Sequence, residues 1–313
     1  MHLLSRLVLT VAAAGLFVSA PSPAAHAETY NLDIDRPHRV GMRYAIEGDA
    51  HSIENSKQYA DGELFADESK TASISLQAQA EVMEVDAEGH VTRMALTLRG
   101  CDILVNGRAV HIDPDRRLLI ISGDETVAYE YERGGPVGAD AALALELLFG
   151  DLTNKGEDEE DPIQAALGLD QRRAPGERWD MDRDMLIQHF ADSGMSAADE
   201  DISGEARFIA LGAADFGWGL MGEDLAVLEM EVGIDAFAFT GEFFPDFMTL
   251  EESDMELRAE LGMSLNPGSH QGWLTFSNEM SFRAVGIVPE ENVELTVEMH
   301  MEDYKALRRR SVN

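Results

Sequence analysis

The stretch Thr71–Val85, TASISLQAQAEVMEV, alternates apolar and polar residues over most of its length. Successive side chains of a β-strand point to opposite faces of a sheet, so a strand here buries one set and solvates the other. The expected buried set is Ile74, Leu76, Ala78, Ala80 and Val82, and the expected solvated set is Ser73, Ser75, Gln77, Gln79 and Glu81.

A hairpin is expected directly after this strand. The turn DAEGH separates it from VTRMALTL at 91–98, and Gly89 is the turn residue that tolerates a left-handed backbone. Half-polar alternation of this length is typical of antiparallel sheet with one wet face. Further strands are expected at Val40–Ile46, Asp102–Val105, Leu118–Ser122, Thr126–Tyr131, Ser203–Leu211, Asp224–Val232, Asp254–Leu265, Gly272–Val285 and Asn292–Tyr304.

Helical patterns are confined to the middle of the chain. Asp140–Phe149 reads DAALALELLF, with an acid near its start and Gly150 directly after its end. Asp161-Pro162 then starts a second short helix at Pro162–Leu167, with Asp as the cap and Pro as the first helical residue. Met185–Ala191 fits either a third short helix or an edge strand.

The fold class that follows is mainly β, with antiparallel sheets and a small central helical insert. The pattern G-x-R-aromatic occurs at Gly41–Tyr44 and again at Gly176–Trp179, each time before a polar loop and a block of paired strands. One interpretation is two β-rich units, 28–135 and 171–313, the second a diverged repeat of the first, joined by a helical insert with an acidic linker at 136–170. The alternative is one curved half-barrel or sandwich system.

The first 27 residues have the pattern of a cleaved signal peptide. Arg6 precedes an apolar run at Leu7–Ala20, and Ala25-His26-Ala27 supplies small residues around a cleavage site. We therefore expect an exported protein, periplasmic or extracellular after cleavage. No later segment has the roughly 20 apolar residues that a transmembrane helix needs, so no transmembrane segment is expected.

The net charge limits which molecules the protein can bind, and the cysteine content limits whether it can form disulfides. The formal net charge of −35 repels nucleic acid but suits a cation or a basic protein partner. Cys101 is the single cysteine, so no intramolecular disulfide can form, and a buried inert thiol is expected.

The acidic stretch at 150–162, GDLTNKGEDEEDP, has some features of a calcium loop. Thr153, Lys155 and Pro162 stand where that loop needs ligands at its positions 3, 5 and 12, so the strict motif fails. A solvated linker between helices is the main interpretation. The alternative is weak cation binding, for which the candidate ligands are Asp151, Glu157, Asp158 and Asp161.

Two other stretches invite a binding interpretation. The segment GAADFGWGLMG at 212–222 carries Phe216 and Trp218 in a glycine-rich turn, and these residues are candidates for a mobile lip over a ligand cavity. Met299-His300-Met301 contains soft copper ligands. Strand alternation, however, places both methionines on the apolar face and His300 on the other, which favours core packing.

Motifs of most enzyme classes are missing from the sequence. There is no G-x-S-x-G, P-loop or Cys-His pairing, so nucleophilic and phosphoryl-transfer chemistry lack support, and no cofactor is expected. With 59 acidic residues, a catalytic pair of carboxylates stays open.

The layout resembles a loosely defined group of uncharacterised exported bacterial β-rich proteins. The residues that carry the resemblance are Pro37, Gly41 and Tyr44, the segment Pro175–Trp179, and the Asn-Pro-Gly turn at 266–268. The resemblance implies a β-rich exported module and no known activity. The layout is also similar to lipoprotein-carrier half-barrels, whose curved sheets hold apolar ligands against helices; this likeness rests on fold analogy.

The expected function is therefore that of an exported, non-catalytic binding or envelope-associated protein, with an apolar molecule or a protein partner as its ligand. One alternative is a carboxylate-dependent hydrolase with its site in a concavity of the sheet. The other is a calcium-stabilised surface module.

Overall fold

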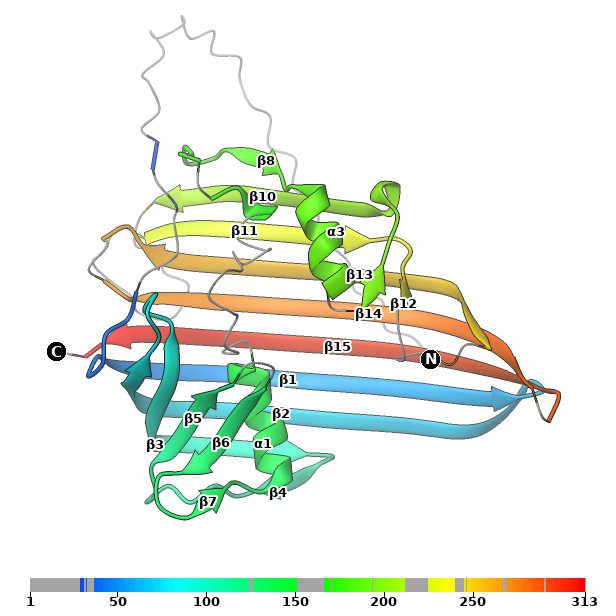
Figure 1. Ribbon diagram of the computed structural model, residues 1–313, viewed down its shortest axis with the longest axis horizontal. Coiled ribbons are helices and arrows are strands. Elements are labelled where there is room, and N and C mark those ends of the chain that lie inside the picture. The colour runs from blue at the N-terminus through cyan, green and yellow to red at the C-terminus, as the bar shows by residue number, and fades with distance from the viewer. Residues whose placement is uncertain are drawn as a thin grey trace, which may run out of the picture.

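The core of the protein is one antiparallel sheet of 13 strands (Figure 1). The computed structural model describes residues 29–30, 32, 37–123, 126–150, 166–169, 171–192, 194–211, 225–239, 245, 247–266, 269–289 and 291–312. The order of strands is β7-β6-β5-β3-β2-β1-β15-β14-β13-β11-β10-β8, and β4 pairs with β3 outside this path. A separate pair of short strands, β9 and β12, forms a small second sheet.

The strands of the large sheet are β1 Arg43–Ala60, β2 Glu63–Val85, β3 Val91–Val105, β4 Arg108–Val110, β5 Leu118–Ser122, β6 Val127–Tyr131, β7 Gly135–Pro136, β8 Arg178–Asp180, β10 Ile202–Leu211, β11 Leu225–Ile234, β13 Met248–Ser264, β14 Gly272–Val288 and β15 Val293–Ser311. The small sheet contains β9 Met195–Ser196 and β12 Ala238–Phe239. The helices are α1 Ala139–Phe149, α3 Arg183–Asp192 and the 3-10 turn η1 Asp199–Asp201. None of the described helices is both long and apolar enough to cross a membrane.

Strands from the two ends of the chain meet at the centre of the sheet. β1 pairs antiparallel with β15, from Tyr44 opposite Ser311 to Ala60 opposite Leu295. The N-terminal hairpin of β1 and β2 therefore lies beside the C-terminal hairpin of β14 and β15 (Figure 1). This pairing unites the strands before α1 and the strands after it in one sheet.

The two faces of the sheet differ in polarity. One row of neighbouring residues crosses eight strands on the face that α1 covers: Phe208, Leu228, Leu261, Leu274, Leu307, Gly48, Leu76 and Cys101. The adjacent row on the opposite face is Arg207, Glu229, Glu260, Thr275, Ala306, Asp49, Ser75 and Asp102. We call these the helix face and the polar face. Along these rows the alternation agrees with the prediction of one wet face, whereas toward the tips of β1 and β2 the helix face also carries the ion pair of Glu54 and Lys70.

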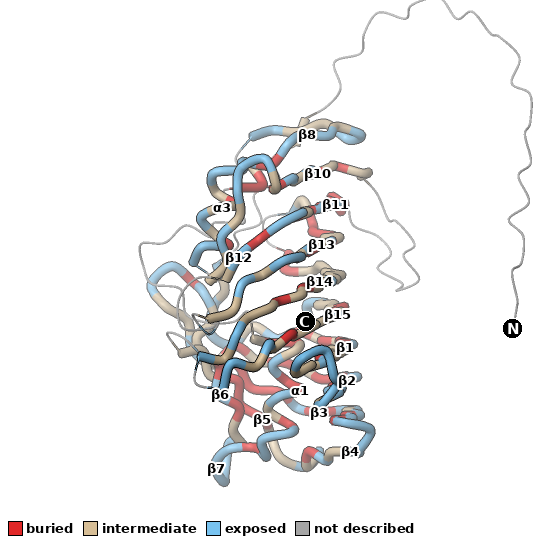
Figure 2. Tube along the Cα trace, turned by 90° about the vertical axis from the view of Figure 1, so that its right-hand side faces the viewer, coloured by how far each residue is buried: buried red, intermediate tan, exposed pale blue. Residues whose placement is uncertain are grey.

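Two apolar clusters lie on the helix face. The first joins α1 to β1, β2, β3, β5 and β6, and the second joins α3 to β10, β11, β13 and β14. Buried positions recur along both sets of strands (Figure 2). Since α1 contacts β6 as well as β1, β2, β3 and β15, the strands from β3 to β6 curl around this helix.

Helix α1 fits closely on the sheet because its buried residues repeat at helical spacing. Ala141, Ala144, Leu145, Leu148 and Phe149 are buried on one side of the helix. Beneath them Gly48 has no side chain, and a Cβ there would lie 2.9 Å from Cδ2 of Leu148. The glycine therefore lets the helix approach the strand.

Most expected strands are present, but several are longer than their alternation indicates. The residues expected as a polar loop before Thr71 instead form most of β1 and the first part of β2, and strands expected at 91–98 and 102–105 are one strand, β3. The open choice at Met185–Ala191 is resolved as a helix, α3. Gly89 has φ +95, as the turn requires. The division into two related units stays a prediction.

Candidate functional site

A row of methionines crosses the middle of the helix face. Met255, Met280 and Met301 lie opposite one another on β13, β14 and β15, and Met299 follows on the same face of β15. Met255 is buried, whereas the other three are half-buried. Methionine is flexible and polarisable, so it adapts to apolar surfaces of irregular shape. The row therefore forms an adaptable apolar surface.

The apolar surface continues along β15 toward the projecting end of the long strands. Leu295, Val297, Met299 and Met301 all lie on the helix face and are all half-buried. At about 3.3 Å per residue this run is about 20 Å long. One leaflet of a bilayer has a hydrocarbon layer of about 15 Å, so the run is long enough for an acyl chain.

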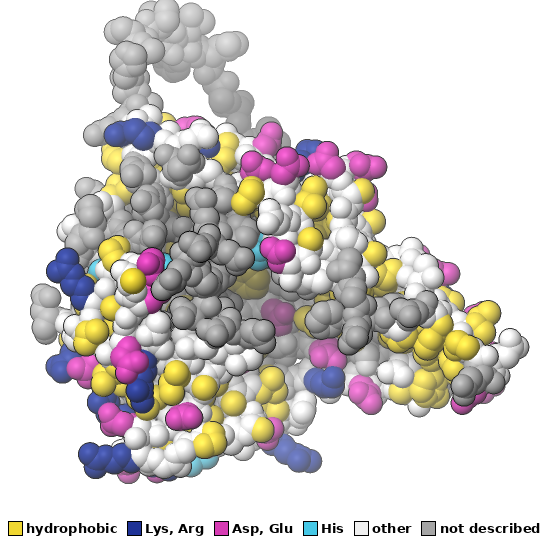
Figure 3. All heavy atoms as spheres, viewed as in Figure 1, with side chains coloured by type: hydrophobic (Ala, Val, Ile, Leu, Met, Phe, Trp, Pro, Cys, Tyr) yellow, Lys and Arg dark blue, Asp and Glu magenta, His cyan; other side chains and the backbone are white. Residues whose placement is uncertain are grey.

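The two ends of this run differ in polarity. Toward the strand tips, Leu64, Phe65 and Ile287 are exposed, with 53%, 57% and 57% of their surfaces accessible, but Leu64 and Ile287 lie on the polar face, opposite Tyr59 and Glu294. Apolar side chains gather at this projecting end and again over the α1 side of the sheet (Figure 3). Beyond Met301, the next helix-face residues of β15 are Asp303 and the buried Lys305. The run is thus apolar along β15 and its β14 neighbours, polar on its β1 side at Gln58, Ser56 and Glu54, and charged beyond Met301.

The polar face carries a small cavity of about 190 Å³, lined mainly by Glu260, Trp273, Thr275, Ala306 and Arg308. Burial, and then the carboxylate of Glu229 directly opposite, raise the pKa of Glu260. The hydrolase alternative requires two carboxyl groups in one cavity, and of this pair only Glu260 lines the cavity. Typical ligand pockets start at about 300 Å³, so this cavity is also small for a substrate site.

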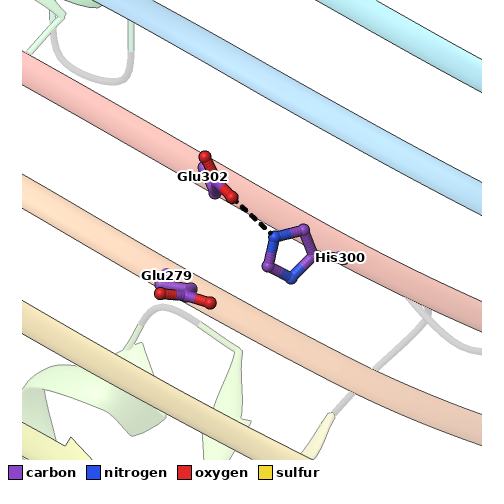
Figure 4. A group of neighbouring side chains, drawn as sticks. All are labelled: Glu279, His300 and Glu302. Carbon is purple, nitrogen blue, oxygen red and sulfur yellow. Dashed lines mark hydrogen bonds and ion pairs between the residues drawn. The ribbon is translucent and has the colours of Figure 1, made fainter. Parts of the chain in front are cut away.

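A second group of polar side chains lies on the polar face behind the methionine row. Glu279 of β14 and His300 and Glu302 of β15 bring their ligand atoms within 4.8 Å of one another (Figure 4). His300 Nε2 lies 3.0 Å from Glu302 Oε1. The predicted separation of His300 from its two flanking methionines is confirmed, because Met299 packs on the helix face.

Of the candidate residues named from the sequence, the structure describes Cys101 but not the candidate cation ligands or lip residues. Cys101 is half-buried, not buried, and burial raises the pKa of its thiol to about 11, which makes it unreactive. The segment predicted to be a signal peptide lies outside the described part of the chain. So do the candidate cation ligands and lip residues, Asp151, Glu157, Asp158, Asp161, Phe216 and Trp218. The helix expected at Pro162–Leu167 is described only at Ala166 and Leu167, which are helical.

Sequence reasoning missed both groups of neighbours. Each methionine of the row belongs to the apolar set of its own strand. That the methionines lie side by side follows only from the pairing register of β13, β14 and β15. Glu279 and Glu302 could have been paired, because Val288 lies opposite Val293 across a short turn, and counting back along both strands places the two glutamates opposite each other.

The fold defines a mainly β protein built on an open antiparallel sheet with helices on one face. No family model matches the sequence, and no curated protein is similar to it. Lipovitellin, in a structure that describes its lipid–protein interactions, is a distant structural likeness with a TM-score of 0.27 and 6% identity; the match covers 85% of this chain and spans 25% of lipovitellin. An outer membrane channel from Pseudomonas putida F1 has a TM-score of 0.18 and 11% identity, over 93% of this chain and 100% of the channel. Likenesses at these TM-scores carry no argument about function.

Proposed function

We propose that the protein is an exported binding protein that holds a chain-like amphiphilic molecule against the helix face. The observation that carries the proposal is the methionine row at the centre of that face, in which Met280, Met299 and Met301 are half-buried. Single exposed apolar side chains are ordinary, but a continuous apolar surface on a folded protein marks a ligand or partner site.

The geometry supports an extended ligand. The run from Leu295 to Met301 follows one strand, so a chain lying along it contacts successive side chains of β15 and their neighbours on β14. Burying about 100 Å² of apolar surface contributes roughly 2.5 kcal/mol, so a chain of acyl length gains several times that before the entropic costs of binding.

The polarity at the end of the run supports a polar head group on that ligand. Asp303 and Lys305 continue the same face of β15 beyond Met301. Lys305 is buried there. A wholly apolar ligand that extended beyond Met301 would cover the half-buried carboxylate of Asp303 without forming a hydrogen bond to it, which costs free energy. The surface therefore favours an amphiphile over a pure hydrocarbon.

The test is titration of the full chain with a fluorescent fatty-acid analogue. The double substitution Met280→Gln with Met299→Gln keeps side-chain length but adds two amides to the apolar surface. It should weaken binding about tenfold, equivalent to about 1.4 kcal/mol. Ser277→Gln on the polar face of β14 is the matched control and should leave affinity unchanged.

Circular dichroism and a melting curve for each variant show whether the fold is kept. Equal affinity of a folded double variant and the unchanged chain, or no binding of the analogue by either, would contradict the proposal.

A further inference from the structure

We propose that Glu279, His300 and Glu302 form a binding site for one divalent ion of the zinc type on the polar face. The three side chains come from two hydrogen-bonded strands in the middle of the sheet, so their backbone positions are fixed by the register. Their ligand atoms already lie within 4.8 Å of one another.

Like charges meet at this point of the sheet. Glu279 lies directly opposite Glu302 on one side and Glu256 on the other, which makes a row of three glutamates across β13, β14 and β15. Like charges at directly opposed positions destabilise a sheet. A bound cation would convert this repulsion into attraction.

The cationic side chains around the row are engaged elsewhere. Arg258 pairs with Glu256 and Glu231. Arg283, two polar-face rows further on, pairs with Glu251 and lies 3.9 Å from Glu298. Within the described part of the chain, Glu279 makes no hydrogen bond or ion pair, and Glu302 contacts only the imidazole of His300. The pair of Glu279 and Glu302 thus lacks a neutralising arginine or lysine.

The donor set selects the class of ion. One imidazole nitrogen and two carboxylates are a combination that Zn²⁺ accepts, with a water in the fourth position. Calcium and magnesium prefer all-oxygen sites, and copper(I) prefers thioether or thiolate sulfur, whereas the methionines point to the other face. Bonds of about 2.1 Å hold tetrahedral ligand atoms about 3.4 Å apart, which rotation of these side chains can reach.

The test is calorimetric titration of the untagged full chain with Zn²⁺ in excess Ca²⁺, which saturates diffuse binding by the acidic surface. We expect one equivalent to bind, and His300→Ala and Glu279→Gln each to weaken binding at least about tenfold. Glu256→Gln is the matched control, because Glu256 stands in the same row but pairs with Arg258, and it should bind as the unchanged chain does.

Melting curves without metal show that each variant is folded, and Zn²⁺ should raise the melting midpoint of the unchanged chain and of Glu256→Gln only. Binding that is equal in His300→Ala and the unchanged chain, or that is lost equally in Glu256→Gln, would overturn the proposal. So would the absence of any Zn²⁺ binding in the presence of Ca²⁺.

Discussion

Gly262 lies directly opposite Trp273 on the polar face, and the indole covers the space that a side chain at 262 would fill. A Cβ at Gly262 would stand 2.0 Å from Nε1 of Trp273, well inside van der Waals contact. The glycine weakens its own strand, and the tryptophan of the neighbouring strand packs over it.

The first prediction concerns this pair. Gly262→Ala should displace the indole and lower the free energy of unfolding by about 1–3 kcal/mol, the usual cost of overpacking. Gly100→Ala is the control, since a Cβ there meets nothing within 4 Å, and it should change stability little. Denaturant midpoints measure both. Equal stability of the two variants would show that the indole does not depend on the glycine.

The second prediction concerns the docking of α1 on the helix face. Leu148 is 1% exposed and reaches down to Gly48, whereas Leu143 on the opposite side of the helix is 52% exposed. Leu148→Ala should therefore cost about 2–5 kcal/mol of stability and Leu143→Ala less than about 0.5 kcal/mol. Chemical denaturation separates the two. A small effect of Leu148→Ala would mean that α1 adds little to the fold.

The third prediction concerns acid stability. His38 is packed 4.8 Å from the ring of His270 and accepts a hydrogen bond of 2.9 Å from Nη1 of Arg309 at its Nε2. Burial, then Arg309 and then His270 lower the pKa of His38 to about 4 from an ordinary value of 6.5. The unfolded chain therefore takes up a proton between pH 6.5 and pH 4 that the folded chain does not.

Stability from this group is complete above pH 6.5 and is lost as the pH falls toward 4, at up to about 1.4 kcal/mol per pH unit. In His38→Gln, an amide oxygen can still accept from Arg309 but cannot titrate. Its stability should fall less steeply between pH 6.5 and 4 than that of the unchanged chain. Parallel curves for the two proteins, from urea midpoints at a series of pH values, would contradict this account.

The sequence predicted which face of the sheet a side chain lies on better than it predicted which strands pair. Alternation in Thr71–Val85 correctly assigned each buried residue from Ile74 to Val82, because the side-chain period of a strand is a local property. The pairing of β1 with β15 has no local signal, since it joins residues some 250 positions apart and depends on what the rest of the sheet leaves unpaired.

The second half of β1 is another region whose structure depends on pairing with strands distant in the sequence. The stretch from His51 to Ala60 has little apolar alternation, and the sequence predicted a polar loop there. It is a strand because β2 and β15 supply backbone hydrogen-bonding partners on both of its edges. The candidate sites depend on these pairings as well: the direction of His300 followed from alternation, but its neighbours followed only from the register.

The central claim is that the methionine row on the helix face holds an amphiphilic molecule, and native mass spectrometry tests it most directly. The full chain, purified without detergent or incubated with lipid vesicles, should carry one added mass of several hundred daltons, roughly that of a lipid, which unfolding releases. The variant with Met280→Gln and Met299→Gln should carry less of it. A bare chain after incubation with lipid, in a sample shown to be folded, would contradict the account.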